Sequence, residues 1–339
     1  MTVVGVIGYG YWGPNLVRNF MANPEARLAY IADRDPARRD KAVRACPGVA
    51  VVAEPDTMFQ DPAVEAVIIA TPVRTHFPLA MEALTHGKHV WLEKPLAATT
   101  VEAERLVSEA DKRGLLLHVD HTFAYTGAVR KLKELYEAKT LGDLYYYDST
   151  RINLGLFQYD VDVIWDLAVH DLAILYYLLP FRPTAVSAHG IAHFADRQPN
   201  TAFLTLYYPR NFIAHINASW LSPVKVRKLM LAGSAKMAVY DDMEPTEKVR
   251  IYDKGIDIPA KGEQTYSLHL DYRAGDMWCP KCSSHEALAL EVEHFLHSIA
   301  HKTPTETDGK IGLETVRVLE AATRSLASNG ALQELIRPS

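Results

Sequence analysis

The chain has 339 residues, more than a single hydrophobic core usually organises, so we expect two domains. Hydrophobic residues make up 48% of the chain and charged residues 23%, a composition typical of a protein that folds throughout. The formal net charge is -5 and basic residues form no stripe, which argues against nucleic acid and anionic membranes as partners.

The first strand and the cysteine content indicate the compartment. The chain begins with the apolar run at residues 3–7 and shows no basic leader, so we interpret that run as a strand and not a signal peptide. The longest apolar stretch, residues 171–179, is too short to cross a bilayer. Three cysteines are too few for a disulfide framework in a chain of this length. We predict a cytoplasmic protein without a transmembrane segment.

Residues 1–120 alternate short β-rich runs with helical stretches, which is typical of parallel βαβ units. Strands are expected at 2–7, 27–32, 49–52, 65–70, 88–92 and 115–119. Helices are expected at 14–22, 36–45, 75–86 and 99–113. The predicted fold of this α/β domain is a doubly wound parallel sheet of the Rossmann type.

Residues 121–339 predict an α+β domain for substrate binding and oligomerisation, with a large, mainly antiparallel, open-faced sheet. Helices at 127–139 and 162–179 flank a strand at 143–153, and a series of strands follows at 184–194, 201–208, 211–220, 225–233, 236–240 and 248–252. The last helices, 285–301 and 311–328, either close this domain or pack back on the first. Apolar alternation at residues 203–207 predicts that the open face is covered in a homodimer or homotetramer.

A glycine-rich segment directly follows the first strand and opens a helix. Its glycines permit a tight turn and a close approach of backbone N–H groups to a pyrophosphate; its residues are Gly8, Tyr9, Gly10, Tyr11, Trp12 and Gly13. Asp33 comes about twenty residues later, at the end of the second strand, where a carboxylate accepts hydrogen bonds from a ribose. This arrangement favours NAD, although Arg34 beside the acid leaves NADP possible.

Two further groups of polar residues predict chemistry. Lys94 follows the strand at 88–92, and the carboxyl ends of parallel strands form the ligand crevice of an open α/β sheet. Asp166 and His170 lie four residues apart on the helix at 162–179, so both point to one side of it. The alternative for this pair is a structural contact at the start of the helix.

In these segments the chain resembles the glucose-fructose oxidoreductase, inositol dehydrogenase and MocA family. The resemblance rests on the glycine fingerprint, the segments 71–76 and 87–95, and Asp166 with His170, in this order and nearly end to end. It implies that Glu93 and the loop carrying Thr71, Pro72 and His76 contact the nicotinamide half of the cofactor. It also implies that Lys94, Asp166 and His170 surround the reacting hydroxyl.

Hydride leaves a secondary alcohol only if the hydroxyl proton is also removed, which requires a base that titrates near neutral pH. His170 suits this role, with Lys94 stabilising the developing alkoxide. A lysine with a lowered pKa is the alternative base, and Asp166 would orient the substrate or the imidazole.

Segments 120–125 and 149–155 resemble the branch of the family that acts on nucleotide-linked sugars, which includes UDP-N-acetylglucosamine 3-dehydrogenases. This resemblance implies that His121, Arg151 and Asn153 contact the substrate, because an Arg fork suits a diphosphate. A surface or subunit contact is the alternative for Arg151. The alternative functions are a free sugar or cyclitol dehydrogenase and a non-catalytic NAD-binding regulatory protein.

Cys279 and Cys282 have the spacing of half a zinc site. No second cysteine pair exists, so four ligands would require some of His285, His269 and Cys46. We therefore predict two reduced thiols in a loop near the rim of the active site and no metal.

Overall fold

The computed structural model describes residues 1–155, 161–194, 198–209, 211–257 and 271–336. The chain divides into two compact units. The first unit comprises Met1–Thr126 and His285–Glu320, and the second comprises the segment Gly127–Ser284 and the residues from Ala321 onward. The helix α9 (Gly309–Ala327) therefore contributes residues to both units.

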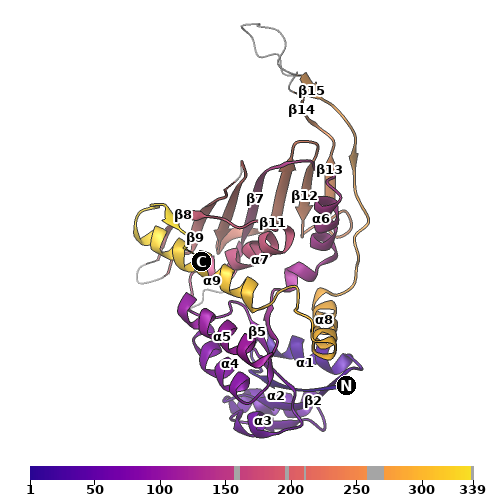
Figure 1. The fold of residues 1–339 in the computed structure, drawn as a ribbon, viewed down its shortest axis with the longest axis vertical. Helices are drawn as coiled ribbons and strands as arrows, with labels where there is room; N and C mark the ends of the chain where they lie inside the picture. Colours follow the sequence, from indigo (N-terminus) through magenta and orange to yellow (C-terminus); the bar gives the residue numbers. More distant parts are fainter. Residues whose placement is uncertain (156–160, 195–197, 210, 258–270, 337–339) are drawn as a thin grey trace. The chain divides into compact units, whose positions relative to one another are not determined.

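The first unit is built on a six-stranded parallel sheet of order β3-β2-β1-β4-β5-β6, which confirms the predicted doubly wound fold (Figure 1). Its strands are β1 (Thr2–Ile7), β2 (Ala26–Ala32), β3 (Ala50–Val52), β4 (Ala66–Ile69), β5 (His89–Glu93) and β6 (Leu117–Asp120). Its helices include α1 (Gly13–Ala22), α2 (Pro36–Ala45), α3 (Asp56–Gln60), α4 (His76–Thr85), α5 (Thr100–Arg113) and α8 (Ala287–His301). Of these, α3 was not expected from the sequence.

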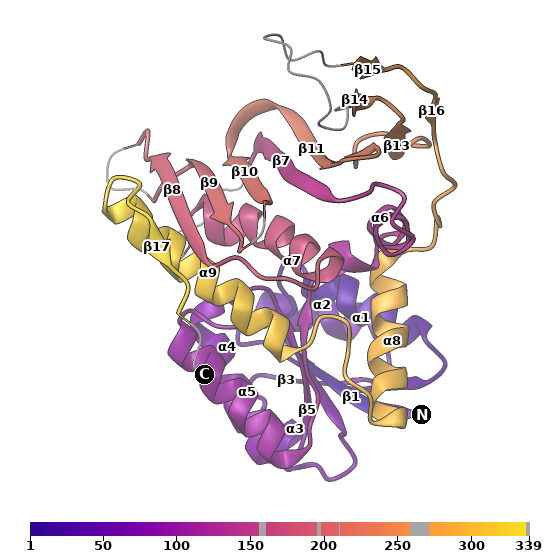
Figure 2. The ribbon, with the colours of Figure 1, turned by 45° about the horizontal axis from the view of Figure 1, so that its top comes forward.

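An aromatic cluster shows how α8 belongs to this sheet. Trp91 of β5 is fully buried and lies edge-on to Phe20 of α1 at 5.5 Å and to Phe295 of α8 at 5.3 Å between ring centroids. In both ribbon views α1 and α8 lie together, and α4 and α5 lie on the other side of the sheet (Figures 1 and 2). Burial of such large rings stabilises the layer by area removed from water.

The second unit contains a nine-stranded sheet of order β16-β13-β12-β11-β7-β10-β9-β8-β17. Its strands are β7 (Leu144–Leu154), β8 (Ala185–Ile191), β9 (Thr201–Tyr207), β10 (Ile213–Ser219), β11 (Leu221–Gly233), β12 (Met237–Asp241), β13 (Val249–Tyr252), β16 (Met277–Trp278) and β17 (Gln333–Glu334). All its pairings are antiparallel except that of β7 with β10, so the prediction of a mainly antiparallel sheet is confirmed.

Two helices, α6 (Gly127–Glu137) and α7 (Val169–Leu178), accompany this sheet, and β14 (Gly255–Asp257) and β15 (Asp271–Arg273) form a separate ribbon (Figure 1). Along β9 the even-numbered residues are buried, whereas Phe203 and Tyr207 are 44% and 40% exposed. The alternation therefore leaves one face of the sheet open within a single chain. Among the described residues, no helix combines the length and hydrophobicity needed to cross a membrane.

Candidate active site

The glycine fingerprint adopts a turn that only glycine fits. Gly8 has φ of +97°, and a Cβ there would overlap the carbonyl of Ala70. A Cβ on Gly13 would overlap the carbonyl oxygen of Gly8. Because Gly13 is also the first residue of α1, the free N–H groups of this helix open directly onto the turn. The turn therefore fits a pyrophosphate, as the sequence predicts.

Asp33 follows β2 and is 8% exposed. Its Oδ2 accepts a hydrogen bond from the backbone N–H of Tyr9 at 2.7 Å, and its Oδ1 accepts one from Asp35 at 2.8 Å. The carboxylate thus joins the end of β2 to the fingerprint turn. Its remaining lone pairs suit the hydroxyl groups of an adenosine ribose, so these residues fit NAD.

Arg34 stands next to Asp33 in the sequence, but its side chain pairs with Glu54. Its guanidinium donates to both carboxylate oxygens of Glu54 at 3.1 Å, and its side chain is largely exposed. Arg38 instead lies beside Asp33, with 3.7 Å between Nη1 and Oδ2, and it also pairs with Asp35 at 3.4 Å. Arg38 was not among the residues predicted from the sequence, although its position one helical turn after Asp35 indicates an ion pair with that residue.

The aromatic residues of the fingerprint have separate environments. Tyr11 is 86% exposed, whereas the indole Nε1 of Trp12 donates to Oδ2 of Asp120 at 2.9 Å. Asp120 is the last residue of β6 and is 2% exposed. Trp12 therefore connects the fingerprint turn with the carboxyl end of the outermost strand.

Asp120 belongs to a cluster of carboxyl groups at the ends of β5 and β6. Glu93 is its direct neighbour in the strand register. Burial, followed by the charge of Asp120, raises the pKa of Glu93 well above its usual value. Burial and Asp120 likewise raise the pKa of Glu291, a fully buried residue of α8. Two like-charged carboxylates in such surroundings cannot both ionise readily.

Two histidines, His118 and His121, flank this cluster, and the pKa of each is lowered. His121 is 1% exposed, and burial lowers its pKa to about 4, with the positive charge of Lys94 acting in the same direction. His118 donates to or accepts from Oε1 of Glu291 at 3.1 Å, and burial lowers its pKa well below the usual value. Both imidazoles are therefore neutral at pH 7.

His76 joins two segments that the resemblance assigns to the nicotinamide half. One ring nitrogen lies 2.8 Å from the carbonyl oxygen of Thr71, and the other lies 2.8 Å from that of Pro95. The imidazole is 1% exposed and thus ties the loop after β4 to the segment after β5. Pro72 lies in the tied loop, and the half-buried Lys94 lies next to the second contact.

In the second unit, Asp166 and His170 are both half-buried and lie on one continuous helical stretch. The stretch begins as a π-helical turn over Ile164–Ala168 and continues as α7. The carboxylate of Asp162 caps its start by accepting from the backbone N–H groups of Ile164 and Trp165. Single π-helical turns are frequent at functional sites.

One oxygen of Asp166 is held by a residue that the sequence analysis did not consider. The indole Nε1 of Trp220 donates to Oδ2 of Asp166 at 3.0 Å. Trp220 is 1% exposed and lies at the corner between β10 and β11. No local pattern announces this pair, because its members are 54 residues apart in the chain.

Arg151 lies inside the second unit and not at its surface. It is 3% exposed, and its Nε donates to Oδ2 of Asp171 at 2.7 Å while Nη2 donates to Oδ1 at 3.3 Å. This buried pair joins β7 to α7. Asn153 lies two residues further along β7 and is half-buried. A contact of either side chain with substrate stays a prediction.

In the described residues the three cysteines are not grouped into a zinc site. Cys279 is exposed, Cys282 is half-buried, and Cys46 is buried in the core of the first unit. His269 lies outside the described residues. Within the described part of the chain, no three His, Cys, Asp or Glu side chains are grouped to hold a metal ion.

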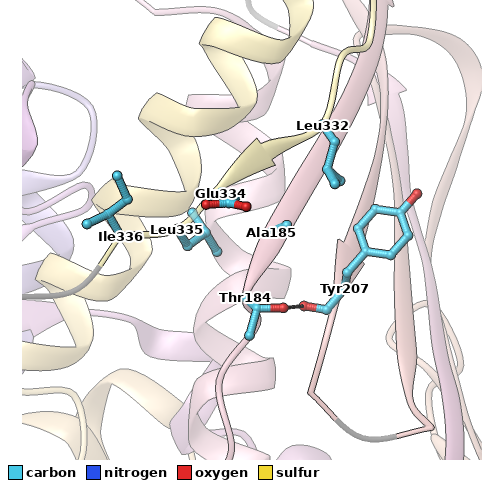
Figure 3. Close-up of a pocket in the computed structure, with 7 residues that line it drawn as sticks. All are labelled: Thr184, Ala185, Tyr207, Leu332, Glu334, Leu335 and Ile336. Atoms are coloured by element: carbon cyan, nitrogen blue, oxygen red, sulfur yellow. Dashed lines mark hydrogen bonds between the residues drawn. The ribbon is translucent and has the colours of Figure 1, made fainter.

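A pocket of about 420 Å³ lies at the β8–β17 edge of the second sheet and contains none of the predicted site residues. Figure 3 shows Thr184, whose hydroxyl donates to the backbone carbonyl of Tyr207 at 3.2 Å, together with Leu332, Leu335 and Ile336. The pocket is therefore distinct in composition from the polar site residues.

Comparisons with known proteins match both halves of the chain to one family. The family model described as "Oxidoreductase family, NAD-binding Rossmann fold" matches residues 2–121, and the "GFO/IDH/MocA C-terminal domain" matches residues 129–239. The chain is 30% identical to UDP-N-acetylglucosamine 3-dehydrogenase of Acidithiobacillus ferrooxidans over 94% of each chain. It is 25% identical to the NAD-dependent scyllo-inositol 2-dehydrogenase of Bacillus subtilis over 97% of this chain and 94% of the other.

A solved structure of the Acidithiobacillus ferrooxidans UDP-N-acetylglucosamine 3-dehydrogenase also matches, with a TM-score of 0.80 and 26% identity. The match covers 96% of this chain and 98% of the other. Fold, fingerprint and relatives together define an NAD(P)-dependent dehydrogenase that acts on CH–OH groups. The chain belongs to the GFO/IDH/MocA oxidoreductase family. This membership sets aside the alternative of a non-catalytic NAD-binding protein.

Proposed function

We propose that this dehydrogenase transfers hydride between NAD and C3 of a nucleotide-linked sugar such as UDP-N-acetylglucosamine. The similarity to UDP-N-acetylglucosamine 3-dehydrogenase over 94% of both chains carries this proposal. It covers both units, so it includes the segments from which we expect substrate contacts, 120–125 and 149–155.

NAD, when bound, accepts the hydride from the alcohol carbon. Asp33 would receive the ribose hydroxyls, and the N–H groups at the start of α1 would face the pyrophosphate. By the general rule for open α/β sheets, we expect the nicotinamide half to lie toward the carboxyl ends of β4, β5 and β6. Glu93 and Lys94 lie at that end of the sheet.

The remaining work of the reaction is to remove the hydroxyl proton and to orient the sugar. We assign the proton to His170 or Lys94 and the orientation of the hydroxyl to Asp166. Neutral His121, with a pKa of about 4, can donate or accept a hydrogen bond without adding a charge. Lys94 belongs to the first unit, and Asp166 and His170 belong to the second.

A substrate panel tests the proposal. Reduction of NAD is measured with UDP-N-acetylglucosamine, scyllo-inositol, myo-inositol and glucose, and the nucleotide sugar is expected to give the highest kcat/KM. Higher kcat/KM with an inositol would replace the proposal by the second candidate, a cyclitol dehydrogenase, which the similarity to scyllo-inositol 2-dehydrogenase favours. The same assay with NADP tests the cofactor, and a preference for NADP would overturn the role of Asp33.

We also propose that the enzyme is a homodimer or homotetramer in which the open face of the second sheet is covered. Ile213 lies opposite Tyr207 in the strand register and is 43% exposed, and Phe203 stacks on His215. Exposed apolar side chains gathered on one sheet face favour a protein contact. Light scattering gives the subunit count, and Phe203→Glu with Tyr207→Glu is expected to yield monomers.

A further inference from the structure

The backbone and the side chain of Trp220 both make specific contacts within the second unit. Its backbone N–H donates to the carbonyl of Asn200 at 2.9 Å, and its carbonyl accepts from the N–H of Gly155 at 3.1 Å. Asn200 itself is fully buried. The indole is therefore anchored at the corner where β10 passes into β11.

The indole ring of Trp220 is closely packed against Gly155. A Cβ added at Gly155 would overlap Cδ1 of the indole, so the ring fills the space that a side chain at position 155 would occupy. An indole N–H can only donate, and this one is directed at a carboxylate oxygen of Asp166. A buried, immobile donor thus meets a half-buried carboxylate.

The backbone contacts of the turn that carries Asp166 do not reach the carboxylate of that residue. The π-helical turn has wider backbone geometry than an α-helix, and the cap supplied by Asp162 fixes only its start. The bond from Trp220 fixes the carboxylate itself. A hydrogen bond from a buried N–H to a carboxylate oxygen is directional, so it favours one rotamer of the Asp166 side chain.

We propose that Trp220 is a positioning residue for the dehydrogenase reaction, and that its indole N–H holds the carboxylate of Asp166 in the orientation that the substrate hydroxyl requires. This inference rests on the proposed role of Asp166. Misplacing a positioned group by about 1 Å costs up to about 100-fold in rate, so the effect is expected in kcat.

The test uses Trp220→Phe, which retains an aromatic ring and removes the N–H. Turnover is measured with UDP-N-acetylglucosamine, or with scyllo-inositol if the panel selects it, and binding of NADH is measured by fluorescence. We expect kcat to fall about 10- to 100-fold while the Kd for NADH stays within about twofold. The matched control is Trp165→Phe, because the Trp165 indole donates to Thr323 at 3.0 Å from the same turn. Its kcat is expected to stay within about threefold of the wild type.

A double-mutant cycle separates positioning from general packing. In an Asp166→Asn background, Trp220→Phe should reduce kcat by less than about threefold, because an amide that accepts the same hydrogen bond has already replaced the carboxylate that acts on the substrate. Gly155→Ala is the second variant, because it keeps the indole N–H but displaces the ring of Trp220. The decrease in kcat that it causes should also disappear in the Asp166→Asn background. It carries the test if Trp220→Phe does not fold.

Three outcomes decide between the proposals. A Trp220→Phe enzyme with wild-type kcat beside a strongly impaired Asp166→Asn enzyme overturns the positioning role alone. An equal loss from Trp220→Phe in both backgrounds also overturns it, because the residue would then act through packing. Near-full turnover of Asp166→Asn would instead refute the proposed role of Asp166, and the inference would fall with it.

Discussion

The two units hold their buried carboxyl groups in different ways. In the first unit Glu93 and Glu291 lie close enough to Asp120 for its charge to raise the pKa of both. In the second unit Asp166 accepts a hydrogen bond from the indole of Trp220, and Asp171 accepts one from the guanidinium of Arg151. Clustering raises the pKa of Glu93 and Glu291, whereas a buried donor restrains the orientation of a carboxylate. The first arrangement suits a site that receives a cofactor, and the second suits one that aims a side chain.

The largest expected effect comes from removing the groups proposed to handle the proton. Lys94→Ala and His170→Ala should each lower kcat by about 10²- to 10⁴-fold, because each would remove acid–base or charge-stabilising chemistry. The Kd for NADH should change little. Steady-state turnover and NADH fluorescence measure the two quantities, and near-full activity in either variant would contradict that residue's assignment.

The next effect concerns stability and tests the fixed donors of the second unit. Arg151→Met leaves Asp171 buried without its cation, which should lower the free energy of unfolding by about 3–5 kcal/mol. Urea unfolding followed by circular dichroism measures this change. The control is Lys310→Ala, which breaks an exposed pair with Asp111 and should cost at most about 1 kcal/mol. Equal losses in both variants would show that the buried pair has no special weight.

A smaller effect should appear in the pH dependence of stability. Because the pKa of His121 falls from 6.5 to about 4 on folding, the native state binds fewer protons between these values. Stability from this group is therefore present above pH 6.5 and is lost as the pH falls toward 4, by about 3 kcal/mol in all. His121→Gln should flatten this acid limb in thermal melts across the pH range. An unchanged limb would show that His121 does not titrate as a buried group.

The opposite sign is expected for the contribution of Glu291 to the pH dependence of stability. Its pKa is raised above 4.5 on folding, so the native state binds more protons and stability falls as the pH rises above 4.5. Glu291→Gln mimics the protonated acid and should remove this decline while leaving stability near pH 4 almost unchanged. Thermal melts of both proteins give the comparison, and parallel curves from pH 4 to 9 would argue against a retained proton.

Local patterns were sufficient for one part of this molecule and insufficient for another. The fingerprint turn and Asp33 could be predicted because the glycines, the end of the second strand and the acid stand at a characteristic spacing along the chain. The bond between Trp220 and Asp166 could not, since it depends on a corner between two strands that form far along the sequence. Glu291 offered a usable signal, because an acid within the apolar run of a late helix is costly to bury unless it is protonated or paired.

The α-helical stretch at 162–179 shows the same limit. Its apolar periodicity predicted a single helix, whereas the structure begins it with a π-helical turn before α7. Hydrophobic spacing fixes which side of a helix is buried but does not distinguish a local widening of the backbone. The fold class was therefore predictable, and the orientation of the site carboxylate was not.

His76 has a dynamic consequence. Because its two ring nitrogens contact the carbonyl oxygens of Thr71 and Pro95, opening either loop disturbs an imidazole that also contacts the other. The two loops should therefore fluctuate as one body, and their backbone amides should show a common rate of hydrogen exchange. Replacing His76 would uncouple the two loops, so that each would show its own rate of hydrogen exchange.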